Sequence, residues 1–191
     1  MSASRTLSPS LALRQAAISR AIELRDVYDD LVPLTAFRDG FVFRGERVSF
    51  GSFQRGIHRP KEMRGRAALS LVTAPAVPGK PRPYDDIFEP DGPVIYHYRC
   101  GPIDQPDNRA LRAAHEDQSP LIYFVGIAPA QYMVVAPVFV VDDLPSDRMV
   151  VLEIGIPLAD TQPGGPVSSL GGLETLRQPL HQLLRARREG A

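Results

Sequence analysis

Two apolar runs, Leu121-Ile122-Tyr123-Phe124-Val125-Gly126-Ile127 and Tyr132 to Val141, flank the short segment Ala128-Pro129-Ala130-Gln131. Both runs are rich in β-branched and aromatic residues, which pack well on the pleated surface of a sheet. The segment between them is short and contains a proline, which is typical of a turn. We therefore predict two long strands joined by a turn.

Shorter strand patterns lie on both sides of these runs. Residues 67–73 form a compact apolar run, and residues 149–156 form a last one. In residues 94–98 the side chains alternate, which places Tyr96 and Tyr98 on the same face of a strand. Each of these stretches is predicted to be a strand.

Between Thr35 and Phe53 the pattern is less regular. Phenylalanines and valines are interrupted there by Asp39-Gly40 and by Gly45, which indicates short strands and turns. The prolines of residues 75–83 predict a loop, because proline cannot continue a strand ladder.

Three helices are predicted. One begins at Ser8-Pro9 and runs to about Asp30, with apolar residues at near-helical spacing. Asp107-Asn108 is interpreted as a cap before a helix from Arg109 to Glu116. An arginine-rich helix is expected from Leu173 to Arg188, after a glycine- and proline-rich linker.

These elements predict an α+β domain with a curved sheet or small open β-barrel and flanking helices. Strands and helices do not alternate in the manner of a parallel doubly wound sheet. We expect an N-terminal helical segment in residues 1–34, the main domain in residues 35–157, and a linker with a C-terminal helix in residues 158–191.

Composition limits the possible classes. The chain has 191 residues, 43% of them hydrophobic and 23% charged, which is ordinary for a globular protein with a real core. Its formal net charge is zero, so only the distribution of charge can indicate a partner. A single cysteine, Cys100, excludes an internal disulfide framework and cysteine-rich zinc sites. With neither a secretory signal nor a bilayer-spanning apolar run, the chain is expected in the cytoplasm.

Cations are concentrated in one part of the chain. Residues 44–83 contain nine Arg or Lys but only two acidic residues, Glu46 and Glu62. Phosphate groups attract such a segment, although a solvated loop in an arginine-rich protein would have the same composition. The candidate contacts to a DNA backbone are Arg55, His58, Arg59, Lys61, Arg64, Arg66, Lys80 and Arg82.

Aromatic and acidic residues follow this basic segment. Tyr84 precedes the pair Asp85-Asp86, and the strand with Tyr96 and Tyr98 comes shortly afterwards. A carboxylate can accept the N4 amino hydrogens of cytosine, and tyrosine rings can stack on a base taken out of the helix. Two alternatives stay open: an ordinary turn at Pro-Tyr-Asp-Asp, and a metal site formed with Asp91.

Taken in order, six segments of the chain resemble the SRA (SET and RING associated) domain, a PUA-like fold that binds modified cytosine in DNA. They are Gly56-Ile57, residues 68–72, Tyr84-Asp85-Asp86, residues 91–96, residues 108–111 and residues 119–123. More closely, the chain is similar to the SRA-like N-terminal region of bacterial modification-dependent HNH restriction endonucleases. In those proteins, segments like residues 55–60, 107–111 and 120–124 recur together.

The resemblance implies a module that recognises 5-methylcytosine, or a related modified cytosine, in duplex DNA by base flipping. Asp86 is expected to read the base, with Tyr84 and Tyr96 stacking on it, and Asp85 and Tyr98 remain the alternatives for these roles. The chain departs from the family at Arg82, which is flanked by prolines where the family's turn is richer in glycine and acid.

We expect no enzymatic activity from this chain alone and no cofactor. It contains no His-Asn-His constellation, no Gly-x-Ser-x-Gly and no phosphate-binding glycine-rich loop ending in lysine. Three alternatives remain: a PUA-like protein that binds RNA or a nucleotide, a recognition subunit for a separate nuclease, and an enzyme. In the enzyme, Asp85, Asp86 and His58 or His97 would act on a small substrate. The partner expected first is duplex DNA in the nucleoid, bound by one copy or by a homodimer.

Overall fold

The two apolar runs form the longest strands of the computed structural model, which describes residues 8–51, 54–75 and 94–154. They are β7 (Leu121–Ala128) and β8 (Gln131–Leu144), and they pair antiparallel. The turn between them contains Ala130 at a φ of +61°. The predicted pair of strands joined by a turn is confirmed.

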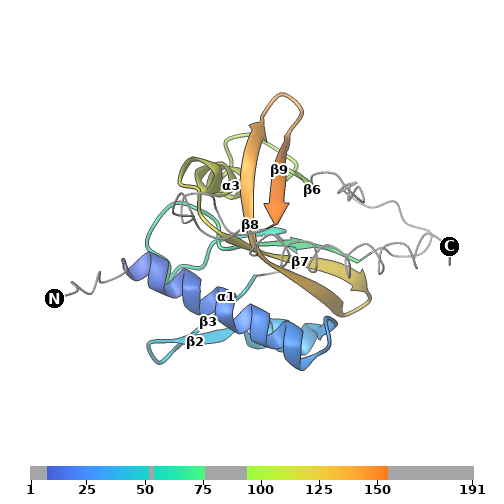
Figure 1. Cartoon of the computed structure of the whole chain (residues 1–191). Helices are drawn as coiled ribbons and strands as arrows, with labels where there is room; N and C mark the ends of the chain where they lie inside the picture. Colours follow the sequence, from blue (N-terminus) through green and yellow to red (C-terminus); the bar gives the residue numbers. More distant parts are fainter. Residues whose placement is uncertain (1–7, 52–53, 76–93, 155–191) are drawn as a thin grey trace, which may run out of the picture.

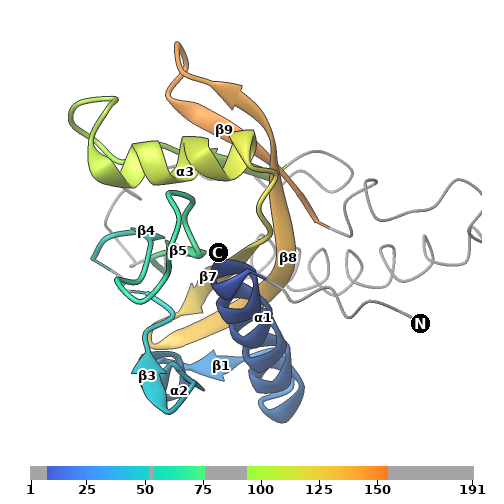
Figure 2. The ribbon, with the colours of Figure 1, turned by 90° about the vertical axis from the view of Figure 1, so that its left-hand side faces the viewer.

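The other predicted strands extend the sheet from these two. On one side β8 pairs with β9 (Met149–Ile154), which pairs with β6 (Val94–His97). On the other side β7 pairs parallel with β5 (Ser70–Thr73), which pairs with β4 (Ile57–His58). A short strand, β1 (Val32–Pro33), lies against the start of β8. The sheet is strongly curled into a half-barrel flanked by helices, so the predicted α+β class with a curved sheet is confirmed (Figures 1 and 2).

Both faces of the central strand β7 are buried. Leu121, Tyr123 and Val125 belong to the core cluster that also contains the apolar side of α3 (Pro106–Glu116). Ile122 and Phe124 face the other way and pack with α1 (Pro9–Val27). Because neither face meets water, the strand has a continuous apolar sequence without polar alternation. Figure 2 shows α3 and α1 on different sides of the curled sheet.

The N-terminal helix begins where its sequence predicts. The Ser8 hydroxyl accepts a hydrogen bond from the backbone N–H of Leu11, at 3.3 Å, and Pro9 occupies the first helical position. None of the helices in the described residues has both the length and the apolar character needed to cross a bilayer.

The expectation of only strands and turns in residues 35–53 is wrong at its start. Leu34–Asp39 forms a short helix, α2. The expected short strands follow as β2 (Phe41–Phe43) and β3 (Glu46–Val48), which pair antiparallel. The Phe37 ring packs against the rings of Phe124 and Tyr132, with centroid distances of 4.8 and 5.4 Å. Tertiary packing of this ring, rather than local propensity, accounts for the helical turn.

The predicted cap of α3 is also wrong. The helix begins at Pro106, and its N-cap residue, Gln105, makes no side-chain capping bond. Asn108 is instead fully buried in the first turn. Its side chain accepts from the backbone N–H of Arg99 at 2.8 Å and donates to the carbonyls of Arg99 and Pro102 at 3.1 and 3.3 Å. Asn108 therefore ties the preceding loop to the helix.

Tyr96 crosses the interior of the curled sheet. Its hydroxyl donates to the carbonyl oxygen of Val72 at 3.4 Å, although β6 and β5 belong to opposite ends of the strand order. The Tyr96 ring also meets the Tyr123 ring edge-on, with centroids 5.6 Å apart. Side-chain contact at Tyr96 thus joins β6 to β5, two strands that no ladder of backbone hydrogen bonds connects within the described residues.

Backbone conformation and the nearby Tyr96 hydroxyl both favour glycine at position 56. Its φ is +62°, and an added Cβ would lie 2.9 Å from the Tyr96 hydroxyl. We predict that Gly56→Ala lowers the free energy of unfolding by about 1–2 kcal/mol, because the backbone is strained and the hydroxyl must shift. Chemical denaturation of Gly56→Ala, Tyr96→Phe and the double variant measures this. The two losses should be clearly less than additive, and full additivity would contradict the contact.

Candidate nucleic-acid interface

The predicted base-reading residues fall mostly outside the described residues. Tyr84, Asp85 and Asp86 lie between β5 and β6 in the sequence, in residues 76–93, and so do Lys80 and Arg82. Their roles remain predictions. The metal alternative at Asp85, Asp86 and Asp91 lies outside the described residues as well.

The two tyrosines that follow this segment belong to the core. Tyr96 is 6% exposed and Tyr98 is 2% exposed. The Tyr98 hydroxyl donates to the Asp143 carboxylate, and burial, followed by this bond, raises the pKa of Tyr98. Arg112 donates to the other oxygen of Asp143 at 3.0 Å. Both tyrosine rings are therefore enclosed, and both hydroxyls are hydrogen-bonded, Tyr96 to Val72 and Tyr98 to Asp143.

The basic loop, residues 54–66, carries most of the predicted backbone contacts. Arg55, Arg59, Lys61, Arg64 and Arg66 are all exposed. The side chains of Arg55 and Arg64 make no ion pair or hydrogen bond within the described part of the chain. At Arg55 and Arg64 the loop therefore presents positive charge that no carboxylate of the described residues offsets at close range.

His58 differs from its cationic neighbours. Its side chain is only partly exposed, and its Nε2 atom is buried without a hydrogen-bond partner among the described residues. Burial lowers the pKa of His58, and a hydrogen bond to the backbone of Ser49 only partly opposes this. The lowered pKa favours the neutral form of His58, so this residue differs from the arginines and lysine around it.

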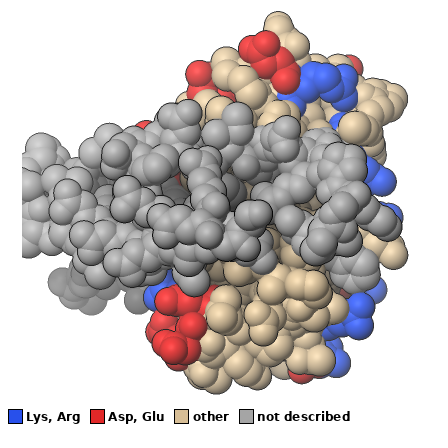
Figure 3. All heavy atoms as spheres, turned by 90° about the vertical axis from the view of Figure 1, so that its right-hand side faces the viewer, with Lys and Arg blue, Asp and Glu red and all other residues tan. Residues whose placement is uncertain are grey.

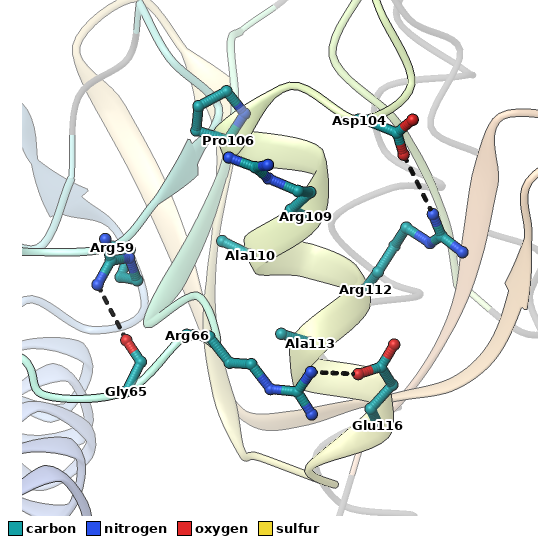
Figure 4. Close-up of a pocket in the computed structure, with 10 residues that line it drawn as sticks. All are labelled: Arg59, Gly65, Arg66, Asp104, Pro106, Arg109, Ala110, Arg112, Ala113 and Glu116. Carbon is teal, nitrogen blue, oxygen red and sulfur yellow. Dashed lines mark hydrogen bonds and ion pairs between the residues drawn. The ribbon is translucent and has the colours of Figure 1, made fainter.

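A groove of about 560 Å³ separates the basic loop from α3. In Figure 4, Arg59 and Arg66 reach it from the loop, and Arg109 lies by Pro106 in the first turn of the helix. Arg112, one helical turn later, completes a set of four lining arginines. The sequence interpretation missed both helical arginines, although their spacing of three residues was a usable signal that they share a face.

Two of these four arginines are neutralised by carboxylates. Arg66 lies 2.7 Å from Glu116 and 2.9 Å from Asp117, and the bond to Asp117 raises the pKa of Arg66 above its usual value. Arg112 lies 3.0 Å from Asp143 and 3.7 Å from Asp104. The hydrogen bond to Asp143 likewise raises the pKa of Arg112.

The other two are not neutralised. Among the described residues, the Arg59 side chain donates only to the carbonyl oxygen of Gly65, at 2.9 Å, and no carboxylate there offsets its charge. Within the described residues, the Arg109 side chain has no ion pair and no hydrogen bond. The groove therefore has room for an anion and two guanidinium groups available to bind it.

Comparison of the chain with protein-family models, with curated proteins and with solved structures finds no match. No group of three or more His, Cys, Asp and Glu side chains in the described ranges is placed to hold a metal ion. Charge is unevenly distributed on the face seen in Figure 3, where Lys and Arg lie mainly along one edge and Asp and Glu form separate groups. The groove beside α3 thus holds two guanidinium groups, those of Arg59 and Arg109, that no carboxylate of the described residues pairs with.

Proposed function

We propose that this chain is a DNA-binding module that recognises 5-methylcytosine, or a related modified cytosine, in duplex DNA. The base leaves the helix and enters a pocket in which Asp86 reads its polar edge and Tyr84 and Tyr96 stack on its faces. The Tyr96 ring is buried in the free protein, so this stacking requires it to be uncovered on binding. We propose recognition without cleavage, so that any nuclease activity would belong to a separate partner.

The observation that best supports the proposal is the contact between Tyr96 and Val72. Residue 72 lies just before the segment that contains Tyr84 and Asp86, and residue 96 lies just after it. Because these two residues touch, the described residues on either side of the segment come together where Tyr96 contacts β5.

The energetics of such a pocket are reasonable. Extruding a base costs a few kcal/mol of stacking and pairing. Stacking on aromatic side chains returns about 1–3 kcal/mol per base, and hydrogen bonds to an aspartate add to this. A methyl group contributes only about 0.8 kcal/mol by burial, so the preference over plain cytosine is modest unless the pocket fits it tightly.

A gel-shift panel tests the proposal. Matched duplexes carry cytosine, 5-methylcytosine in several contexts, or 5-hydroxymethylcytosine, each at a stated salt concentration. We expect one modified duplex to bind several-fold more tightly than its plain counterpart. Equal affinity for all duplexes, or stronger competition by structured RNA than by modified DNA, would contradict it.

A further inference from the structure

We propose that Arg59 and Arg109 together bind a backbone phosphate of duplex DNA, which makes α3 a second DNA-contacting element beside the basic loop. The choice of DNA rests on the proposed function, whereas the choice of phosphate rests on the groove itself. The two guanidinium groups come from different elements but line the same space.

The pairing of charges selects these two arginines. The lining contains four arginines and two carboxylates, Asp104 and Glu116. Glu116 is bound by Arg66 at 2.7 Å, and Asp104 lies 3.7 Å from Arg112. Each carboxylate is therefore offset by an arginine that is not needed for the ligand. What remains is the positive charge of Arg59 and Arg109, which a phosphate diester matches.

The floor of the groove suits the backbone of a nucleic acid. Small residues, Gly65, Ala110 and Ala113, lie among the lining arginines. They let the sugar–phosphate chain approach closely, and a planar guanidinium can then bind phosphate oxygens with two parallel hydrogen bonds. Since such contacts carry no sequence information, this site would hold modified and unmodified DNA alike.

The backbone that carries Arg109 is held in place by its neighbour. The preceding residue, Asn108, is fully buried and makes three hydrogen bonds to the backbone of the loop before α3. The position of the Arg109 backbone is therefore set before any ligand arrives. This reduces the ordering cost of binding to the rotamers of the two arginine side chains.

Salt-dependent binding of the variants Arg59→Gln and Arg109→Gln tests the inference. Glutamine removes the positive charge, and at position 59 its side-chain amide can still donate a hydrogen bond to the carbonyl oxygen of Gly65. The matched control is Arg20→Gln, which also loses one exposed positive charge but lies on α1, where Arg20 pairs with Glu23. Equilibrium affinity is measured by fluorescence anisotropy on modified and plain duplexes between 50 mM and 300 mM salt, after circular dichroism confirms folding.

Each groove variant is expected to weaken binding about five- to tenfold at 0.1 M salt. The plot of log affinity against log salt concentration has a negative slope, and this slope should become shallower by about 0.9 in each variant. Both duplexes should be affected equally, so the wild-type ratio between them is preserved. If the groove variants lose no more affinity or salt dependence than Arg20→Gln does, the inference is overturned. This holds whatever the ratio of wild-type affinities for modified and plain duplexes.

The same data separate this inference from the proposed function. If the wild-type protein shows no preference for modified DNA but the groove variants lose affinity and slope, base recognition fails and the phosphate site stands. If the wild-type protein binds no duplex at low salt, the proposed function fails, and NMR of the arginine Nε–Hε signals decides the site. Shifts of Arg59 and Arg109 on adding inorganic tripolyphosphate support it, and unchanged signals overturn it.

Discussion

Replacing Arg14 with methionine is expected to lower the free energy of unfolding by about 3 kcal/mol. Arg14 is 4% exposed, and its Nη1 atom donates at 2.7 Å both to the carbonyl of Ala68, before β5, and to that of Pro120, before β7. Burial lowers the pKa of Arg14 to about 10, so the side chain stays charged at neutral pH. Methionine fills similar volume but leaves both carbonyls without this donor.

The control for this prediction is on the same helix. Arg20→Met removes an exposed arginine that pairs with Glu23 three residues later, and such pairs contribute little, so the change should cost less than about 0.5 kcal/mol. Urea denaturation of both variants measures the difference. Equal stabilities of the two variants would show that Arg14 does not hold α1 to the sheet.

The second large effect concerns DNA recognition. Asp86→Ala is expected to abolish the preference for modified DNA and to weaken binding of the preferred duplex about tenfold to a hundredfold. A hydrogen bond to a charged group is worth about 1.5–3 kcal/mol, which corresponds to this range. The salt-sensitive background binding should remain, because the arginines of the basic loop and of α3 are unchanged.

Asp85→Ala serves as the matched comparison. It removes the neighbouring carboxylate with the same change in charge, so it should leave the preference largely in place. If Asp85→Ala abolishes the preference and Asp86→Ala does not, the roles of the two residues are exchanged. Preference that survives in both variants would show that neither carboxylate reads the base.

Much of the fold follows from the sequence, because its strongest patterns coincide with its most buried elements. The continuous apolar run of β7 reflects burial of both faces, one in the core cluster that includes α3 and the other in the cluster that includes α1. The Ser8 cap and Pro9 act locally, and so the start of α1 is also readable from the sequence.

Features that depend on distant partners were not predictable in this way. The helical turn at Leu34–Asp39 is associated with the packing of Phe37 on Phe124, a contact between residues far apart in the chain. Asn108 has the residue type of a cap, yet it binds the backbone of the preceding loop from within the helix.

The candidate site shows the same limit. A count of cations identifies the basic loop, but it cannot separate Arg66, which two carboxylates neutralise, from Arg59, which no carboxylate in the described part of the chain offsets. A count of cations also cannot show that Arg109 lines the same groove, because this depends on α3 lying beside the loop in the folded protein. Pairing in three dimensions, rather than composition, distinguishes the available charges.

The most direct measurement of the central claim is the fluorescence of 2-aminopurine placed next to a modified cytosine in a duplex. Fluorescence of this base analogue rises when its neighbour leaves the stack. We predict a clear rise when the wild-type protein binds the duplex with 5-methylcytosine or another preferred modification, and a much smaller one with Asp86→Ala at equal occupancy. Saturable binding of the preferred duplex without any rise would contradict base flipping and, with it, the proposed mode of recognition.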